Sequence, residues 1–189
     1  MSSTDSLKTE EFPLPPEVQA QYELFTRKSE LNIVIWGPRP SNDPEIKKLY
    51  LKRIQIQQKI VELGHNAVLG EEDKLVNKLQ QSGLNLFCAE FIEANNADYI
   101  VCFMASPGSI GEVHDFAMKF TNKMMICMNS KYYKGYSGQG ILAAFEGKNG
   151  KMDWFKHPDD IDGCHLAGRV IKQIKQVNQA KQYELVSTL

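Results

Sequence analysis

Apolar residues along the chain fall into short continuous runs that alternate with longer periodic segments. The runs at 31–38 (LNIVIWGP), 97–105 (ADYIVCFMA) and 123–129 (KMMICMN) each contain a continuous apolar stretch, namely IVIW, YIVCFMA and MMICM, bounded by polar or turn residues. Such runs are typical of strands buried on both faces of a parallel sheet. A shorter strand is expected at 65–69 (HNAVL), before an acidic loop.

Between these runs, apolar residues recur at helical spacing. Helices are predicted over 45–64, over 74–96 with an interruption at Gly83, over 110–122 and over 164–185. Strands that alternate with helices imply right-handed βαβ crossovers. The pattern therefore predicts an α/β fold: a Rossmann-like three-layer sandwich, with a mostly parallel sheet of about five strands and helices on both faces.

Beyond residue 130, the alternation of apolar runs with helical segments becomes less regular. A glycine- and tyrosine-rich loop is expected at 132–140, a hairpin over 142–155 that turns at Lys148-Asn149-Gly150, and a turn at 157–163 (HPDDIDG). Three tyrosines of this region either cover the edge of the sheet or form a lid over a planar ligand: Tyr132, Tyr133 and Tyr136.

Composition along the chain predicts an N-terminal arm followed by one domain. Residues 1–15 are rich in Ser, Thr, Glu and Pro and predict a flexible arm, followed by a short docking helix over 16–30. Residues 16–189 are expected to form a single Rossmann-like nucleoside- or nucleotide-binding domain. Because the N-terminus lacks a basic-then-apolar signal and no run of about eighteen apolar residues occurs, a cytoplasmic location without membrane insertion is expected.

Composition narrows the classes of partner. The 189 residues are 42% hydrophobic, as expected for a globular chain, and 22 basic against 23 acidic residues give a net charge of -1. No positive field is present to hold a nucleic-acid backbone, although a mononucleotide remains compatible. A small nucleoside or nucleotide ligand is therefore expected, and no polymeric nucleic acid.

Cysteines and histidines show no metal-ligand spacing. The cysteines, which form no CxxC pair, are Cys88, Cys102, Cys127 and Cys164, and all four are expected to be reduced and mostly buried. The four histidines, His65, His114, His157 and His165, also lack ligand spacing to any cysteine. Neither a metal site nor a cofactor is predicted.

The ligand site of an open α/β sheet lies beyond the carboxyl ends of its strands. Three strand ends carry distinctive loops, at Trp36-Gly37-Pro38, at 70–73 (GEED) and at Ser106-Pro107-Gly108-Ser109. These loops are expected to converge on one pocket. Trp36 either stacks on a base or belongs to the core, and 71–73 supplies either an acid or only a solvated turn.

The loop at 106–109 gives the strongest signal for a ligand. Small residues let the backbone approach a ligand, and the N–H groups that open the next helix suit a phosphate or ribose. The loop is neither GxGxxG nor a Walker motif, so neither hydride transfer with NAD nor NTP hydrolysis is indicated.

Glu112 has two interpretations. Ser109-Ile110-Gly111-Glu112 fits a capping box, in which Ser109 and Glu112 would satisfy each other's backbone amides. Alternatively, Glu112 acts on a ligand at the edge of the sheet. Gly111 costs about 1 kcal/mol relative to alanine at a helical position, which suggests that something packs against the backbone there.

Taken together, the segments IVIWGP, ELGH, LFCAEFIEANNADYIVCFM and GSIGEVHDFA resemble the nucleoside 2-deoxyribosyltransferase-like superfamily. This is a Rossmann-like group of N-glycosidic-bond enzymes, related to the nucleotide-binding phosphoribohydrolases of the lysine-decarboxylase-like type. The resemblance covers about residues 31 to 130. GSIGE is similar to the Gly-Thr-x-x-Glu segment of the family, whose glutamate is the nucleophile.

The resemblance implies that Glu112 attacks the anomeric carbon, that Ser109 binds ribose or phosphate, and that the protein is a homo-oligomer. The residues implied to contact substrate are Trp36, Gly37, Pro38, Ser106, Gly108, Ser109, Gly111 and His114, although the residues around His114 favour an exposed or internally hydrogen-bonded side chain over a catalytic one. The family's aspartate-rich loop is replaced here by Ala105-Ser106-Pro107. The acid that protonates the departing base is therefore expected from Glu90, Asp115 or the cluster at 71–73.

Three hypotheses follow. The protein hydrolyses or transfers the glycosidic bond of a nucleoside, nucleotide or NAD-like molecule. Alternatively, it is a sensor that binds a nucleotide signal in the same pocket without chemistry. A third possibility is a subunit whose chemistry lies in a partner chain.

Overall fold

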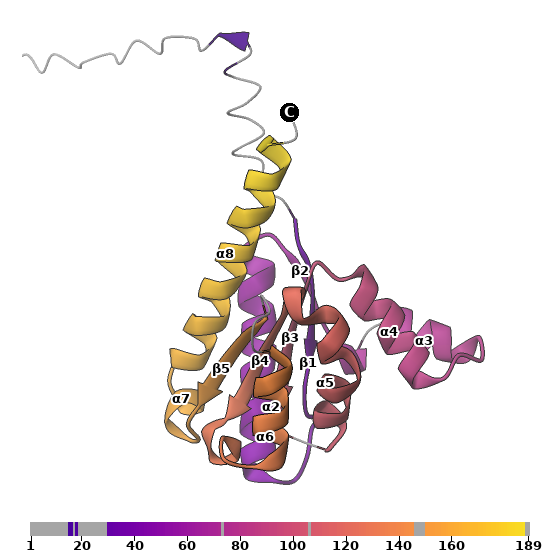
Figure 1. Cartoon of the computed structure of the whole chain (residues 1–189), viewed down its shortest axis with the longest axis vertical. Helices are drawn as coiled ribbons and strands as arrows, with labels where there is room; N and C mark the ends of the chain where they lie inside the picture. The colour runs from indigo at the N-terminus through magenta and orange to yellow at the C-terminus, as the bar shows by residue number, and fades with distance from the viewer. Residues whose placement is uncertain are drawn as a thin grey trace, which may run out of the picture.

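The structure is a computed structural model that describes residues 15, 16, 18, 30–72, 74–105, 107–145 and 150–187. The expected flexible arm, apart from Pro15, and most of the predicted docking helix lie outside these residues. Figure 1 shows the fold with its strands running side by side and α8 extending beyond them. Among the described helices, none is long and apolar enough to cross a membrane.

Five parallel strands form one sheet, as the sequence pattern predicts. They are β1 (Asn32–Trp36), β2 (Asn66–Leu69), β3 (Tyr99–Met104), β4 (Met124–Asn129) and β5 (Lys151–Phe155). Their order is β2-β1-β3-β4-β5, and every pairing is parallel. Every residue of β3 and β4 is buried, which explains why these two runs are continuously apolar.

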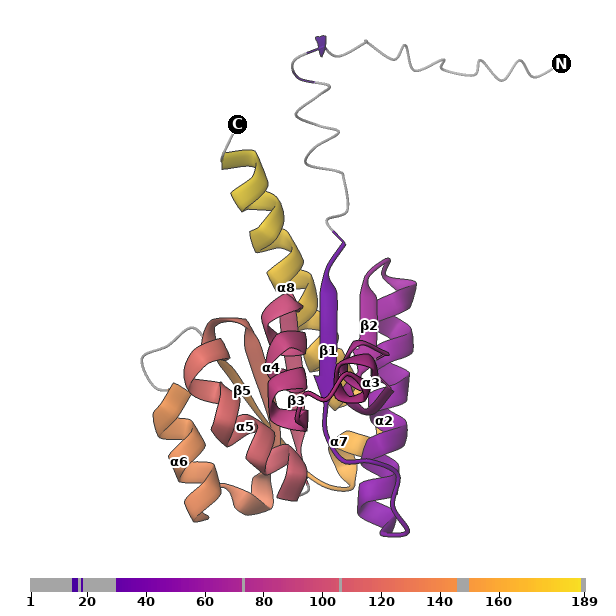
Figure 2. The ribbon, with the colours of Figure 1, turned by 90° about the vertical axis from the view of Figure 1, so that its right-hand side faces the viewer.

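Helices connect the strands and cover both faces. They are α2 (Pro44–Glu62), α3 (Lys74–Gln81), α4 (Leu86–Asn96), α5 (Pro107–Phe120), α6 (Tyr136–Phe145), α7 (Asp159–Asp162) and α8 (His165–Ser187). In Figure 2, α5 and α6 lie on one side of the sheet and α2 lies on the other. The predicted Rossmann-like sandwich is confirmed.

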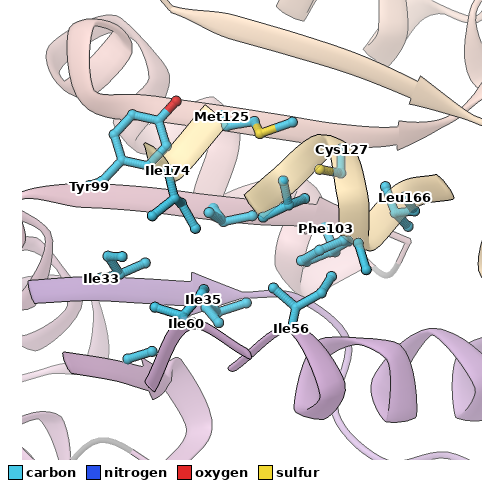
Figure 3. Packing of buried hydrophobic residues seen from close by; sticks show 14 of the residues in the cluster. Ile33, Ile35, Ile56, Ile60, Tyr99, Phe103, Met125, Cys127, Leu166 and Ile174 are labelled. Atoms are coloured by element: carbon cyan, nitrogen blue, oxygen red, sulfur yellow. The ribbon is translucent and has the colours of Figure 1, made fainter. Parts of the chain in front are cut away.

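Alternate residues of each central strand point to opposite faces of the sheet and so belong to two separate hydrophobic cores. On one face, Ile33, Val101 and Cys127 pack with residues of α2 and α8, and Figure 3 shows part of this cluster. On the other face, Ile100 and Ile126 pack with residues of α4, α5 and α6. The period-two alternation of a strand thus divides the side chains between two helical layers.

Local signals set the ends of α2 and the start of α4. The Asp43 carboxylate accepts hydrogen bonds from the amides of Glu45 and Ile46, and Asn85 caps α4 through the amide of Cys88. Gly64 follows α2 with φ of 84°, a left-handed conformation that favours glycine. The bounds of α2 agree with the predicted 45–64 to within two residues, and α4 begins three residues after the predicted interruption at Gly83.

The region after β4 differs from the prediction. Residues 136–145 form α6 instead of a loop, and β5 pairs in parallel with β4, so the hairpin expected over 142–155 is wrong. Glycine here reflects close packing: a Cβ at Gly138 would clash with the carbonyl of Tyr132. The expected turn at 157–163 contains the short helix α7.

The cysteine expectation is only partly right. Cys102 and Cys127 are buried in the strands, whereas Cys88 and Cys164 are exposed free thiols. Both exposed thiols lie at helix starts, where the apolar-run argument for burial does not apply.

Candidate functional site

The strand order places a switch point between β1 and β3. The chain passes from β1 outward to β2, then returns past β1 to β3 and continues to β4 and β5. The connections after β1 and β3 therefore depart on opposite faces, which is the arrangement at which open α/β sheets bind their ligands. The sequence signals at Trp36-Gly37-Pro38 and at 106–109 follow these two strands.

The side chain of Arg53, on α2, holds the backbone of the loop after β1 in place. Its guanidinium is fully buried and donates hydrogen bonds to the carbonyl oxygens of Ile35 (Nη2–O, 2.7 Å) and Pro38 (Nη1–O, 2.6 Å). A Cβ at Gly37, whose φ is 155°, would lie 2.9 Å from Arg53 Nε and 3.0 Å from Phe103 Cβ. Gly37 and Pro38 thus shape the floor of the site through their backbone.

Glu71 is the anionic partner of Arg53. The two side chains form a bidentate pair with Nη1–Oε1 of 3.1 Å and Nη2–Oε2 of 2.8 Å. This pair neutralises the buried guanidinium and attaches the turn after β2 to the loop after β1. Glu71 therefore has a structural role, while Asp73 and the side chain of Glu72 lie outside the described residues.

Trp36 belongs to the core. The side chain is 2% exposed, its Nε1 donates to Glu93 Oε2 at 2.9 Å, and its ring packs against that of Phe116 at 5.3 Å. The indole edge also fills the space where Gly70 would carry a Cβ. Of the two interpretations offered by the sequence, burial supports the core, because no open face is left for a base to stack on.

A small crevice of about 40 Å³ opens above Trp36, and we call it the Glu90 crevice. It lies between the loop after β1, the turn after β2, and the helices α3 and α4. Its lining residues are Trp36, Gly37, Arg39, Gly70, Glu71, Val76, Asn77, Gln80, Leu86 and Glu90. Three predicted site residues therefore meet here: Trp36, Gly37 and Glu90.

Glu90 is the titratable group that its surroundings perturb most clearly in this crevice. It is half-buried on α4, and burial raises its pKa above the ordinary value of 4.5. The Asp115 carboxylate raises this pKa further, and the Arg39 guanidinium opposes the shift. Glu90 and Asp115, which are far apart in sequence, are thus brought into electrostatic contact by α4 and α5.

Helix α5 begins earlier than the sequence indicates. With Pro107 as its first residue, a position that proline favours, Ser109 lies in the first turn and Glu112 in the second. The capping box expected from Ser109 to Glu112 does not fit these bounds, because Ser109 follows the N-cap. The side chains of Gly108, Ser109 and Glu112, and all of Ser106, are not among those that the structure describes.

Gly111 exposes bare helix backbone. A Cβ at this position would meet no atom of the described residues within 4 Å, so the expected packing against the backbone does not come from them. His114 and Asp115 are exposed one turn further along α5. Of the interpretations of His114, its position therefore supports an exposed side chain.

A second, larger cavity of about 140 Å³ lies at the carboxyl ends of β3, β4 and β5, and we call it the Asn129 cavity. It is lined by Asp43, Glu45, Ile46, Leu49, Ala105, Asn129, Lys131, Tyr132, Phe155, His157 and Ile161. The first two of the three loops line the Glu90 crevice, and Ala105, which directly precedes the third loop, lines this cavity. The side chains of residues 106–109 are not among those that the structure describes, so the convergence of all three loops stays a prediction.

Several residues of both sites escaped the sequence prediction. Arg53 lies among Leu49, Ile56 and Ile60 on the inner stripe of α2, and that position was a readable signal for a buried cation. Glu93 and Arg39 carried no such signal, since their roles depend on which elements the fold brings beside them.

Among the described residues, no group of three His, Cys, Asp or Glu side chains could hold a metal ion. Comparison with models of known protein families matched none of them, and a search of curated proteins also gave no match. The fold and the edge of the sheet that carries both cavities place the chain in the class of Rossmann-like α/β proteins.

Proposed function

We propose that the protein hydrolyses or transfers the N-glycosidic bond of a nucleoside, nucleotide or NAD-like substrate, with Glu112 as nucleophile and Glu90 as general acid. The observation that carries the proposal is the raised pKa of Glu90 beside Asp115 and Arg39, in a crevice at the carboxyl ends of β1 and β2. The motif resemblance of GSIGE to the deoxyribosyltransferase-like superfamily supplies the role of Glu112.

A carboxyl group with a raised pKa suits the protonation of a departing base. Burial disfavours the charged form of Glu90, and the neighbouring Asp115 adds repulsion. A protonated Glu90 can give its proton to the ring nitrogen of the base as the glycosidic bond breaks. This fills the role for which the loop Ala105-Ser106-Pro107 offers no acidic residue.

Glu112 stands three residues before Asp115 on α5, so the two positions share one face of the helix. In the proposed reaction, the Glu112 carboxylate bonds to the anomeric carbon, the carbon–nitrogen bond breaks, and its electron pair leaves with the base. Glu90 supplies the proton that the base requires. Water, or an acceptor base in a transfer reaction, then releases the sugar from Glu112 and returns a proton to Glu90.

A pair of helical glycines tests whether the ligand lies against α5. A Cβ at either Gly111 or Gly168 would meet no described atom within 4 Å, and Gly168 lies on α8, which packs on the far face of the sheet. Alanine at either position should raise the free energy of unfolding by up to about 1 kcal/mol through helix propensity. Only Gly111→Ala should weaken substrate binding; equal binding by both variants would contradict a ligand at this helix.

Chemistry is tested by incubating the protein with NAD⁺, nucleoside monophosphates and deoxynucleosides and measuring free base by chromatography. Glu112→Gln should abolish release while leaving the melting temperature unchanged. Turnover equal to that of the parent would refute the nucleophile. Binding without turnover in both proteins would instead favour the sensor.

The proposal includes a homo-oligomer. Phe87 on α4 is 49% exposed although its ring stacks on Phe116 at 5.2 Å, and Leu86 beside it is 41% exposed. An apolar surface next to the crevice supports self-association. Light scattering coupled to size exclusion should report more than one chain, and Phe87→Ser should shift the protein toward the monomer.

A further inference from the structure

Among the residues that the structure describes, the Asn129 cavity shares none of its lining with the Glu90 crevice, although both open at the carboxyl edge of the sheet. The crevice adjoins the end of β1, and the cavity adjoins the end of β4, two strands away in the sheet. Two strand spacings amount to about 10 Å. A dinucleotide, whose two bases are joined through sugars and phosphates, can span this distance with one ring in the cavity.

The size and walls of the cavity suit one planar ring. Its volume of about 140 Å³ is close to the roughly 150 Å³ of an engineered cavity that holds benzene. Leu49, Phe155 and Ile161 are buried and form an apolar floor, and Tyr132 is partly exposed at the rim. Aromatic side chains at the rim and floor favour stacking on a heteroaromatic ring.

Two polar groups can recognise the edge of such a ring. His157 Nε2 is buried and has no hydrogen-bond partner among the described residues. Asn129 is 7% exposed and uses its Oδ1 to accept from the amide of Lys131, which leaves its amide N–H groups available. Buried polar groups of this kind are normally satisfied, so a ligand atom would complete them.

The charges of the cavity favour a neutral ring over a phosphate. Lys131 Nζ lies 3.0 Å from Glu45 Oε2, and His157 Nδ1 lies 3.7 Å from the other oxygen of the same carboxylate. The carboxylate of Asp43 caps α2. The lysine is thus already paired with an acid, and the two carboxylates would repel an anion.

We propose that the Asn129 cavity binds the second heteroaromatic ring of a dinucleotide whose first base lies at the mouth of the Glu90 crevice, which at about 40 Å³ does not enclose a ring. The inference rests on the proposed function and names its substrate class: a dinucleotide such as NAD⁺ in preference to a mononucleoside. Ala105, which lines the cavity, directly precedes the segment that begins α5, so the joining sugars and phosphates pass beside Glu112.

The test compares the affinities of NAD⁺ and nicotinamide mononucleotide by calorimetry, in a Glu112→Gln background so that turnover does not interfere. NAD⁺ should bind about tenfold more tightly or better, the range expected for stacking of one base. Tyr132→Ala and His157→Leu should remove this preference and leave the affinity for the mononucleotide unchanged. Tyr133→Ala is the matched control, because this neighbour packs edge-on against Trp154 and does not line the cavity.

Equal affinities for the two probes in the parent, or a preference retained by both cavity variants, would overturn the inference. Competition by inorganic phosphate that disappears in Lys131→Gln would also overturn it, since the cavity would then be an anion site. A preference for NAD⁺ that depends on Tyr132, without release of base by the unmutated protein, would support the ring site while refuting the proposed reaction. Tyr132 is exposed enough for its variant to fold.

Discussion

Arg53 and Glu71 are joined by two hydrogen bonds, at 3.1 Å and 2.8 Å, across the space between α2 and the turn after β2. The arginine side chain is 0% exposed and that of the glutamate is 13% exposed. The same guanidinium holds the carbonyls of Ile35 and Pro38. This arrangement makes the ion pair part of the scaffold of the Glu90 crevice.

Breaking this pair should destabilise the fold strongly. Glu71→Gln leaves the guanidinium buried without its anion, and the free energy of unfolding should fall by about 3 kcal/mol, as measured by urea denaturation. The control is Lys48→Gln, which breaks a 2.9 Å pair with Asp162 whose side chains are both about half exposed. That change should cost less than about 1 kcal/mol. Similar losses in the two variants would contradict the scaffold role.

Gly37→Ala should also destabilise the protein, because the new Cβ would lie within 3.0 Å of atoms of the buried Arg53 and Phe103. Overpacking of this kind costs about 1–3 kcal/mol. Thermal denaturation measures the effect, and ligand affinity should fall with it because the floor of the crevice moves. Unchanged stability would show that the loop after β1 relaxes without cost.

Two substitutions should move the pH dependence of turnover in opposite directions. If Glu90 must be protonated, activity is lost as pH rises through its pKa. Asp115→Asn removes a carboxylate that raises this pKa, so the alkaline limb should move to lower pH. Arg39→Gln removes a cation that lowers it, so the limb should move to higher pH. Shifts of the same sign, or none, would contradict the assignment of Glu90 as the acid.

Glu90 should also make stability depend on pH. Its pKa in the folded state is raised, mainly by burial, above the ordinary value of 4.5. The folded state therefore holds the proton more tightly, and this contribution to stability is complete below the unfolded pKa and lost as pH rises through the folded one. Glu90→Gln should lack this loss in urea denaturation measured over a pH series that begins below 4.5 and rises from there. A parallel pH profile for the two proteins would show that Glu90 is not perturbed.

The fold class was predictable because its signals are local. The runs that became β1, β3 and β4 are apolar except for Asn32 and Asn129 at strand ends, since both faces of these strands are buried. Helices α2 and α8 carry an apolar stripe at helical spacing. The region from 136 to 155 was not predictable in this way. Its glycines suggested a loop, but Gly138 is small because α6 packs against the carbonyl of Tyr132, and that contact is invisible in the sequence.

The candidate site, like the fold, was predictable from the sequence only in part. The sequence by itself determined that Trp36-Gly37-Pro38 and the start of α5 would lie beyond strand ends, because these segments directly follow apolar runs that alternation with helices marks as parallel strands. Only the tertiary structure decided that Trp36 is buried against Glu93, that Glu71 neutralises Arg53, and that Asp115 faces Glu90. The physical reason is that the burial and the electrostatic environment of a side chain depend on the residues packed around it. The two hydrogen-bonded pairs are separated by 18 and 57 residues in sequence, and they come into contact only when the helices pack on the sheet.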